Sequence, residues 1–369
     1  MRVLQVTTDN DRRGAQIFAG DLHTGLADLG CDVETVALAP GRVGGLDFPP
    51  LGSRRRSLRT ITALRSRSRH ADVVIAHGST ALPVTALAML GSRTPFVYRQ
   101  VSDSLFWAPS ASRRLRVRMA MSRAEKIVAL WDGAAEILAT RFSVPSEKLH
   151  VIPNGVRGSS WTPPSEAERH RAKSELRLPL DLPVVAFAAA FTPEKGPDLA
   201  IETVASIAEA HLLMVGAGPE DAQVRALADR LLEGRVTFVG STSDIRKVYS
   251  ATDVLLFPSR GGDSMPAVVI EAGMMGIPAV ATNTGALSSM LESGKTGQVV
   301  PTPTSSELAS ATRTLLHDPE RRRAIGSAAR AAFLRSFDME VVSARWLSVL
   351  DAVMVPTSAS SAQTVVESQ

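Results

Sequence analysis

Residues 257–273 read Phe257-Pro258-Ser259-Arg260-Gly261-Gly262-Asp263-Ser264-Met265-Pro266-Ala267-Val268-Val269-Ile270-Glu271-Ala272-Gly273. An apolar run ends at Phe257, a loop with adjacent glycines follows, and a helix is predicted to begin with Pro266 as its first residue, where proline is favoured. Met265 has no side-chain oxygen with which to cap such a helix. The amides of Ala267 and Val268 would then lack partners at the positive end of the helix dipole, which is an anion-binding arrangement.

Two acids flank these amides. Asp263 comes just before them, and Glu271 follows Ala267 by four residues, about one helical turn. Both carboxylates could reach a ligand whose phosphate rests on the helix end, and carboxylates accept hydrogen bonds from sugar hydroxyls. The spacing alone leaves open an ordinary strand–loop–helix unit with two solvated acids.

Outward from this stretch, short apolar runs alternate with amphipathic stretches along the whole chain. Strands are predicted in the first half at residues 3–7, 33–38, 73–76, 96–99 and 127–130, and in the second half at residues 184–189, 212–215, 236–239, 254–257 and 279–282. These runs are apolar on both faces, which is typical of parallel strands buried between helix layers. The segment 15–29 is predicted to be a helix with one apolar stripe, formed by Phe18, Leu22, Leu26 and Leu29. The pattern predicts an α/β protein with two doubly wound parallel sheets.

A chain of 369 residues is long enough for two domains. The polar, proline-containing interval 155–165 is the candidate linker. We therefore expect a first domain at 1–155 and a second at 156–338. A final helix at 339–354 could return to the first domain, and the Ser/Ala/Thr-rich tail 355–369 is predicted to be disordered. Ligands of such sheets bind beyond the carboxyl ends of the strands, so two Rossmann-like domains would face each other across a cleft.

Composition is that of a globular protein, with 44% hydrophobic and 21% charged residues. Cys31 is the only cysteine, and the chain lacks a long apolar run and a signal-peptide pattern, so a cytoplasmic protein is expected. Residues 1–155 hold 21 Lys/Arg against 13 Asp/Glu. This excess is compatible with an anionic ligand. No nucleic-acid-binding motif accompanies it, so no nucleic-acid partner is predicted.

Asp263 and Glu271, followed by Gly276-Ile277-Pro278, resemble the paired-acid motif of glycosyltransferase family 4. Members of that family are retaining, nucleotide-sugar-dependent enzymes of the GT-B fold. Further segments match the family in order along the chain: Gly14-Ala15-Gln16, residues 151–156, Glu194-Lys195-Gly196, residues 215–219, residues 239–240 and residues 253–259.

The resemblance implies roles for these positions. Asp263 would contact the donor sugar and act in catalysis, Glu271 would bind the ribose hydroxyls, and Lys195 would supply charge to the donor diphosphate. Backbone near four further residues would also hold the diphosphate: Met265, Pro266, Ala267 and Val268. Gly14 would admit phosphate because it has no side chain. From the sequence alone, Lys195 could equally be a solvated lysine and Gly14 a simple turn glycine.

Two departures from the family pattern concern charge at the donor site. The first acid is Asp263 rather than Glu, which is shorter by one methylene. The family's usual arginine, five positions before Lys195, is Ala190 here. We expect another arginine to replace it, with four candidates near strand ends or in loops: Arg12, Arg13, Arg99 and Arg260.

A third departure concerns the first domain, where the family often has a histidine after the fourth strand. Gln100 and Val101 stand there, and His77, at the end of an earlier strand, is the nearest alternative. His77 is the second catalytic candidate, although a histidine at a strand end is commonly structural. Arg99, Gln100 and Trp107 are predicted to bind the acceptor, with core packing as the alternative for Trp107.

The predicted function is transfer of a sugar from a nucleotide-diphosphate donor to a hydroxyl of a small-molecule or glycan acceptor, with retention. No metal and no cofactor are predicted, because the cleft segments contain no Asp-x-Asp motif and no metal-ligand cluster. The alternatives are another GT-B enzyme, such as a sugar-nucleotide epimerase or phosphorylase, and a noncatalytic sugar-nucleotide-binding protein. The arginine-rich segments 53–70 and 113–123 could make a peripheral membrane contact, or they could be solvated helix faces.

Overall fold

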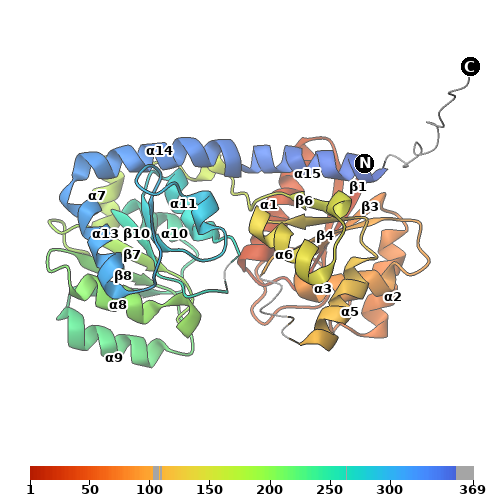
Figure 1. Cartoon of the computed structure of the whole chain (residues 1–369), viewed down its shortest axis with the longest axis horizontal. Coiled ribbons are helices and arrows are strands. Elements are labelled where there is room, and N and C mark those ends of the chain that lie inside the picture. Colours follow the sequence, from red (N-terminus) through yellow and green to blue (C-terminus); the bar gives the residue numbers. More distant parts are fainter. Residues whose placement is uncertain (103–107, 109, 263, 355–369) are drawn as a thin grey trace, which may run out of the picture.

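Two α/β lobes lie side by side, and two long consecutive helices run across both of them (Figure 1). The computed structural model describes residues 1–102, 108, 110–262 and 264–354. Asp263, Trp107 and the tail 355–369 therefore lie outside the described residues. Among the described segments, no helix has the length and apolar character needed to cross a membrane.

The first lobe is built on a six-stranded parallel sheet in the order β2-β1-β3-β4-β5-β6. Its strands are β1 (Arg2–Thr7), β2 (Asp32–Ala37), β3 (Val73–His77), β4 (Phe96–Arg99), β5 (Lys126–Ala129) and β6 (Leu149–Val151). Its helices are α1 (Gly14–Asp28), α2 (Leu58–Ser68), α3 (Gly78–Ala88), α5 (Ala111–Met121), α6 (Asp132–Phe142) and the short η1 (Ser146–Lys148). The sheet changes direction of winding between β1 and β3, so the loops after these strands border a crevice.

The second lobe repeats the architecture with a sheet in the order β12-β11-β10-β7-β8-β9, whose switch point lies between β7 and β10. Its strands are β7 (Val184–Ala188), β8 (His211–Val215), β9 (Val236–Gly240), β10 (Val254–Phe257), β11 (Ala279–Thr282) and β12 (Gln298–Val300). Its helices are η2 (Gly158–Ser160), α7 (Glu166–Glu175), η3 (Pro193–Lys195), α8 (Pro197–Ala205), α9 (Asp221–Leu232), α10 (Ile245–Ser250), α11 (Ala267–Met274), α12 (Leu287–Met290), α13 (Ser305–His317) and α14 (Pro319–Phe337).

The predicted fold class is confirmed, and all ten predicted strands are present with ends shifted by no more than one residue. The sequence reading missed β6 and β12, which are three residues long and mostly only half-buried, so they carry little apolar signal. The predicted helix at 15–29 is α1, and its stripe of Phe18, Leu22 and Leu26 is buried. Leu29, however, is exposed, because it follows the last helical residue.

The last helix, α15 (Met339–Met354), lies on the first lobe although the preceding α14 packs on the second. Trp346, Val349 and Leu350 of α15 are buried in one cluster with the apolar stripe of α1. The two helices approach closely at Gly25, where an added Cβ would lie 2.0 Å from Ser343 Oγ. The first lobe is thus completed by residues that follow the second lobe in the sequence.

Candidate active site

A pocket of about 290 Å³ lies between the lobes and is lined from both of them. The first lobe contributes the first turn of α1 and the end of β4, and the second lobe contributes the loop before α11 and its first turn. Residues 154–156, which link the lobes, complete the wall. The volume is at the lower end of the range of ~300–1,000 Å³ for small-molecule sites. The predicted cleft is therefore present, and it is bordered by the segments that follow β1 and β10, one strand of each switch point.

Helix α11 begins at Ala267, so the prediction that Pro266 is the first helical residue is wrong by one position. Pro266 has φ −75° but an extended ψ of 120°, and it occupies the N-cap position without a side-chain cap. The carbonyl of Pro266 accepts a hydrogen bond from the amide of Val269 at 3.3 Å. No described residue accepts a hydrogen bond from the amides of Ala267 or Val268. The predicted uncapped helix start is present, and both Pro266 and Ala267 line the pocket.

Glu271 lines the same pocket and is half-buried there. The hydroxyl of Tyr249 in α10 donates a hydrogen bond to Glu271 Oε2 at 2.9 Å. Burial raises the pKa of the Glu271 carboxyl to about 7, although the bond from Tyr249 opposes this shift, and the nearby Asp21 adds to it. Glu271 is therefore close to half ionised at neutral pH. Tyr249 was not predicted, because it lies 22 positions earlier in sequence and only the tertiary fold brings it here.

Lys195 ends η3, in the turn after β7, and is followed by Gly196 with φ +68°. Two hydrogen bonds join this turn to the loop that leads to α11. Glu194 O accepts them from Arg260 N at 2.7 Å and from Ser259 Oγ at 3.0 Å. An added Cβ at Gly196 would lie 2.3 Å from Pro258 O, so glycine is needed for this close approach. Lys195 itself is half-buried and does not line the pocket.

Gly14 is the first residue of α1, and its preceding residue Arg13 provides no side-chain cap. The amides of Gln16 and Ile17 donate to Arg13 O, which leaves those of Gly14 and Ala15 as the open end of the helix. Both residues line the pocket. An added Cβ at Gly14 would meet no protein atom within 4 Å, so packing does not require glycine here and the space is open to a ligand.

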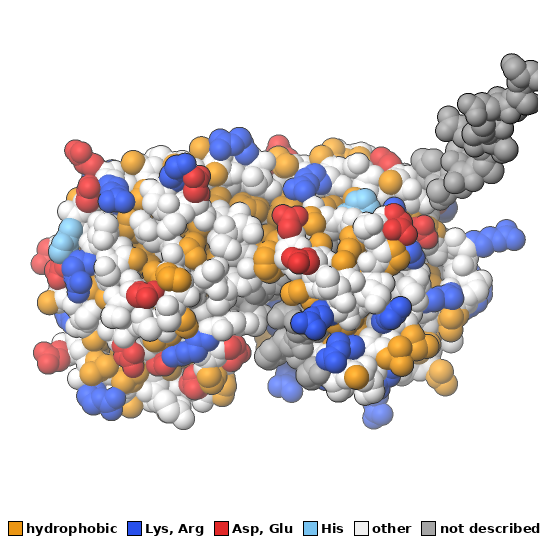
Figure 2. All heavy atoms as spheres, viewed as in Figure 1, with side chains coloured by type: hydrophobic (Ala, Val, Ile, Leu, Met, Phe, Trp, Pro, Cys, Tyr) orange, Lys and Arg blue, Asp and Glu red, His pale blue; other side chains and the backbone are white. Residues whose placement is uncertain are grey.

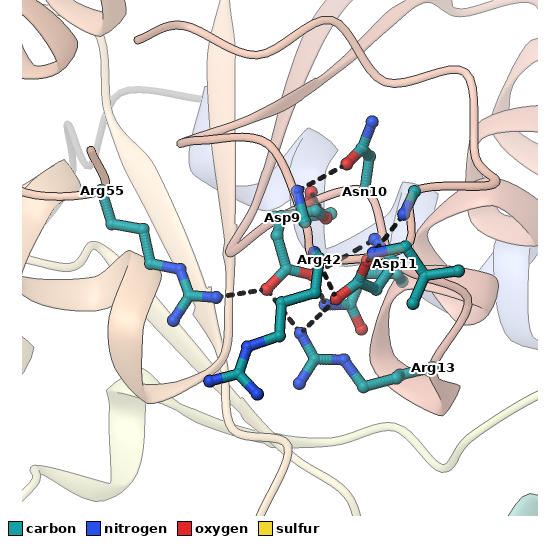
Figure 3. A network of polar contacts seen from close by, with 11 residues as sticks. Asp9, Asn10, Asp11, Arg13, Arg42 and Arg55 are labelled. Carbon is teal, nitrogen blue, oxygen red and sulfur yellow. Dashed lines mark hydrogen bonds and ion pairs between the residues drawn. The ribbon is translucent and has the colours of Figure 1, made fainter. Parts of the chain in front are cut away.

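A polar network fixes the loop between β1 and α1 (Figure 3). Asp9 is fully buried and accepts hydrogen bonds from Gln16 Nε2 at 2.8 Å, from Arg55 at 2.7 Å and from Arg13. Asp11 accepts from the backbone amides of three residues in the next loop: Arg42, Val43 and Gly44. The start of α1 is therefore held in place by buried and partly buried carboxylates that do not themselves line the pocket.

Arg99 and Asn154 join the two lobes beside the pocket, which both residues line. Arg99 Nη2 donates to Asn154 Oδ1. Asn154 Nδ2 in turn donates to Met265 O at 2.7 Å, two residues before α11. The guanidinium carbon of Arg99 lies 3.6 Å from the ring centroid of Phe18 in α1. Asn154 was not singled out in the sequence, where only its position in the link between the domains could have indicated it.

His77 does not line the pocket, although its strand ends at the cleft side of the sheet. It is only 2% exposed, and its Nε2 lies 2.8 Å from Gln5 Oε1. Its ring lies near those of Phe18 and Trp346, and burial and the charge of Arg99 hold its pKa well below the usual value. His77 is therefore neutral and enclosed, and a catalytic role for it stays a prediction.

The remaining acceptor-side and arginine candidates are placed as follows. Gln100 is buried, and its Nε2 lies 3.4 Å from Ser102 O, whereas Trp107 lies outside the described residues.

Arg260 forms a bidentate ion pair with Asp198, at 2.8 and 2.6 Å, away from the pocket. Arg13 pairs with Asp9, and Arg12 is exposed; neither lines the pocket. Among the four candidates to replace the arginine expected at Ala190, Arg99 alone lines it.

The assembled site offers two open helix ends, one buried arginine and one carboxylate with a pKa near neutrality. Such a set can bind a phosphate-bearing ligand whose hydroxyl groups reach Glu271. Within the described residues, no group of three or more His, Cys, Asp or Glu side chains could hold a metal ion. Asp263, the predicted contact to the donor sugar, lies outside the described residues.

Comparison with known proteins gives consistent matches for both lobes. A family model described as "Glycosyl transferases group 1" matches residues 168–332, and one described as "Glycosyltransferase Family 4" matches residues 12–157. The D-inositol 3-phosphate glycosyltransferase of Nocardia farcinica is 29% identical over 230 residues, which are 58% of this chain and 50% of that protein. The alpha-D-kanosaminyltransferase of Streptomyces kanamyceticus is 29% identical over 213 residues, which are 56% of this chain and 54% of that protein.

The whole fold is also similar to that of solved structures. HepE of Anabaena, crystallised in complex with UDP-glucose, matches with a TM-score of 0.84 at 22% sequence identity. The match covers 95% of this chain and 100% of that chain. At this identity, the likeness establishes the architecture of two facing lobes. The chain spans about half the length of the curated relatives it matches.

Proposed function

Because this chain belongs to glycosyltransferase family 4 and has the GT-B fold, we propose that it is a retaining glycosyltransferase. It would move a sugar from a nucleotide-diphosphate donor to a hydroxyl of a small-molecule or glycan acceptor. The observation that carries this proposal is the start of α11. Its open amides and the half-buried Glu271 share one interlobe pocket with the open amides of α1.

In this proposal each part of the pocket has one task. The amides of Ala267 and Val268 hold the diphosphate, and Lys195 contributes charge from the adjoining turn. Glu271, in its ionised form, accepts hydrogen bonds from the ribose hydroxyls. Asp263 contacts the donor sugar. Gly14 leaves room for phosphate at the opposite wall. Charge that develops on the departing diphosphate is stabilised by dipoles that are already oriented, which avoids reorganisation during the reaction.

Retention requires that the acceptor attack the face from which the diphosphate leaves. A phosphate oxygen of the leaving group can then accept the proton of the acceptor hydroxyl. Closure of the lobes would exclude water and so favour transfer over hydrolysis. Since oriented amides and a lysine are assigned to the diphosphate, the proposal includes independence from divalent metal ions. A cytoplasmic location and the absence of a nucleic-acid partner stay predictions.

A membrane surface is proposed as a peripheral partner of the face formed by α2, α3 and α5 in the first lobe, where α3 packs against both α2 and α5. Segment 53–70 holds seven arginines and segment 113–123 holds five, and neither contains Asp or Glu. Leu58, Leu115 and Met119 are 81%, 58% and 63% exposed. On the face drawn in Figure 2, Lys and Arg side chains lie beside hydrophobic ones over this lobe. Such a combination suits anionic lipid headgroups.

Co-sedimentation with vesicles tests this contact. The wild type should bind phosphatidylcholine vesicles that contain phosphatidylglycerol, and it should not bind vesicles of phosphatidylcholine alone. Replacement of Leu115 and Met119 together by Ser should weaken binding, since both side chains are exposed and their loss leaves the fold intact. Equal binding of the double variant would exclude this face.

The proposed activity is tested by a thermal-unfolding screen against UDP-, GDP- and dTDP-sugars and the free nucleotides. At least one donor should raise the melting temperature, because a ligand that binds only the folded state stabilises it. The protected donor is then incubated with and without acceptor pools, and products are followed by mass spectrometry. Transfer with retained anomeric configuration supports the proposal. Interconversion of the donor without acceptor would indicate an epimerase, and binding without turnover a noncatalytic protein.

A further inference from the structure

Arg99 is a buried cation that has no ionic partner among the described residues. It is 1% exposed, yet it lines the interlobe pocket. Within the part of the chain that the structure describes, only Nη2 has a hydrogen-bond partner, the amide oxygen of Asn154, whereas Nε and Nη1 have none. No acid of the described residues forms an ion pair with it. A buried charge that lacks both a counter-ion and part of its hydrogen bonds is costly, so its retention calls for an explanation.

The acids that line the pocket do not neutralise this charge. Asp21 and Glu271 both lie in the wall, but neither is an ion-pair partner of Arg99. Burial raises the pKa of both carboxyls. Burial also lowers the pKa of Arg99 to about 9, which leaves it protonated at neutral pH. The ring of Phe18 can stabilise the guanidinium by a cation–π contact. An aromatic ring and a neutral amide leave the net charge uncompensated.

Arg99 is also placed where the two open helix ends meet. Phe18, under the guanidinium, follows Gly14 by one turn of α1. On the other side, Asn154 connects Arg99 to Met265 O, just before α11. The first residues of both helices line the same pocket. A guanidinium and the positive ends of two helix dipoles thus converge on one space, and each favours a bound anion.

We propose that Arg99, together with the first-turn amides of α1 and α11, forms an oxyanion site whose counter-ion is a phosphate group of a substrate. The inference rests on the proposed function, since it assigns a phosphate-bearing substrate to the same pocket. Two sources share this chemistry: the diphosphate of the donor, and a phosphate carried by the acceptor. Because Arg99 belongs to the first lobe and α11 to the second, the site is complete only when both lobes border the anion.

Arg99→Met tests the site by removing the charge while keeping an unbranched side chain. The melting temperature of the ligand-free variant should equal or exceed that of the wild type, because an uncompensated buried charge is lost. Calorimetric titration is done with UDP, GDP and dTDP, and the nucleotide that binds the wild type most tightly is compared with its nucleoside, which has no phosphate. Loss of charge-assisted hydrogen bonds should weaken nucleotide binding by about ten- to a hundredfold and leave nucleoside binding unchanged.

Arg65→Met is the matched control in the same lobe. Arg65 donates to the carbonyl oxygens of Ala88 and Leu90 outside the pocket, so its loss should leave both affinities unchanged. If Arg99→Met does not fold, Arg99→Lys carries the test. It keeps the charge but loses the planar fork, and nucleotide affinity should fall severalfold at constant nucleoside affinity.

The outcomes separate the two sources of phosphate. Weaker nucleotide binding by Arg99→Met assigns the site to the donor. Unchanged nucleotide binding, with loss of inorganic phosphate binding by the nucleotide-saturated protein, assigns it to the acceptor. If neither affinity changes while the wild type binds nucleotide, the oxyanion site is refuted and the proposed function stands. If the wild type binds none of the three nucleotides, the proposed function fails and this inference fails with it.

Discussion

Each wall of the pocket contains the uncapped start of a helix, but different interactions support the two helix starts. Helix α1 and helix α11 both start without a side-chain cap, and both direct open amides to the interlobe space. Behind α1 stands an ionic network in which the buried Asp9 binds two arginines. Behind α11 stands an apolar cluster that includes Met265, Val269 and Ile270. In the second wall, Glu271 is the one carboxylate of the described residues beside the helix start. It accepts a hydrogen bond from the hydroxyl of Tyr249.

This difference separates positioning from recognition. In the first wall, Asp9 and Asp11 lie outside the pocket and fix the backbone, so their loss should act mainly on stability. In the second wall, packing fixes the backbone, and the acid is left with an exposed side for a ligand. The same residue type therefore has opposite roles in the two walls. Four changes would sharpen or break this comparison.

The largest effect is expected for Glu271→Gln. If Glu271 binds the ribose hydroxyls, the variant loses charge-assisted hydrogen bonds that are worth about 1.5–3 kcal/mol each, which lowers donor affinity by about a hundredfold or more for two bonds. Calorimetric titration with the donor nucleotide measures this. The fold should be retained, because glutamine has the same shape. Glu202→Gln, an exposed acid of the same lobe, is the control. Unchanged affinity would remove Glu271 from the site.

Asp9→Asn should act on stability instead. The change keeps the shape of the side chain but removes the charge that binds Arg13 and Arg55. It also replaces one carboxylate oxygen, which accepts hydrogen bonds, by an NH2 group, which can only donate them. We expect a loss of about 1–3 kcal/mol in the free energy of unfolding, measured by urea denaturation. Donor affinity should change by less than about tenfold. Asp47→Asn, an exposed acid of the same lobe, should be neutral. A loss of affinity as large as that of Glu271→Gln would show that the walls do not differ in role.

In the second wall, Glu271 should make donor binding depend on pH. The pKa of the Glu271 carboxyl is about 7, and the ionised form accepts the hydrogen bonds, so donor affinity should rise by about tenfold between one unit below and one unit above this value. Binding titrations across this pH range should show a larger rise in donor affinity for the wild type than for Glu271→Gln, in which the Glu271 carboxyl no longer titrates. Tyr249→Phe removes a bond that favours the ionised carboxyl, so its midpoint should move to higher pH. Identical profiles for all three proteins would contradict the assignment.

The smallest effect is expected from a chelator. Oriented amides and Lys195 are assigned to the diphosphate, so turnover should be unchanged when EDTA is added to the wild type in the transfer assay. Complete loss of turnover, with recovery after magnesium or manganese is added back, would mean that an ion supplies charge that the comparison attributes to helix ends and basic side chains.

Local signals in the sequence predicted the skeleton of the site but not its electrostatics. The helix start after Met265 was predicted from the preferences of proline and of capping residues. In the structure the helix begins one residue later, because the extended ψ of Pro266 is not determined by the local sequence. The bond from Tyr249 to Glu271, and with it the size of the pKa shift, depends on packing between α10 and α11. His77 had the right strand end, but its ring is enclosed by α1 and α15, and no local pattern could show this.

Arg99 illustrates the same limit from the other direction. In the sequence it was one of four arginines that could replace a missing charge, and no spacing rule distinguished among them. Burial, the contact with Phe18 and the lack of an ionic partner among residues 1–102, 108, 110–262 and 264–354 distinguish it in the structure. Each of these properties arises where β4, α1 and the interlobe link meet.

The return of α15 to the first lobe affects how the protein folds during synthesis and how its lobes could be exchanged with those of relatives. Phe18, Leu22 and Leu26 of α1 bury their apolar stripe against Trp346 and Val349, more than 300 positions later. During synthesis, the part of this stripe that contacts α15 therefore stays exposed until the second lobe has been translated, and a chaperone can bind it in that period. An exchange of donor specificity between relatives would likewise have to be made as an insertion between two junctions, because a simple fusion after the first lobe would deprive α1 of its covering helix.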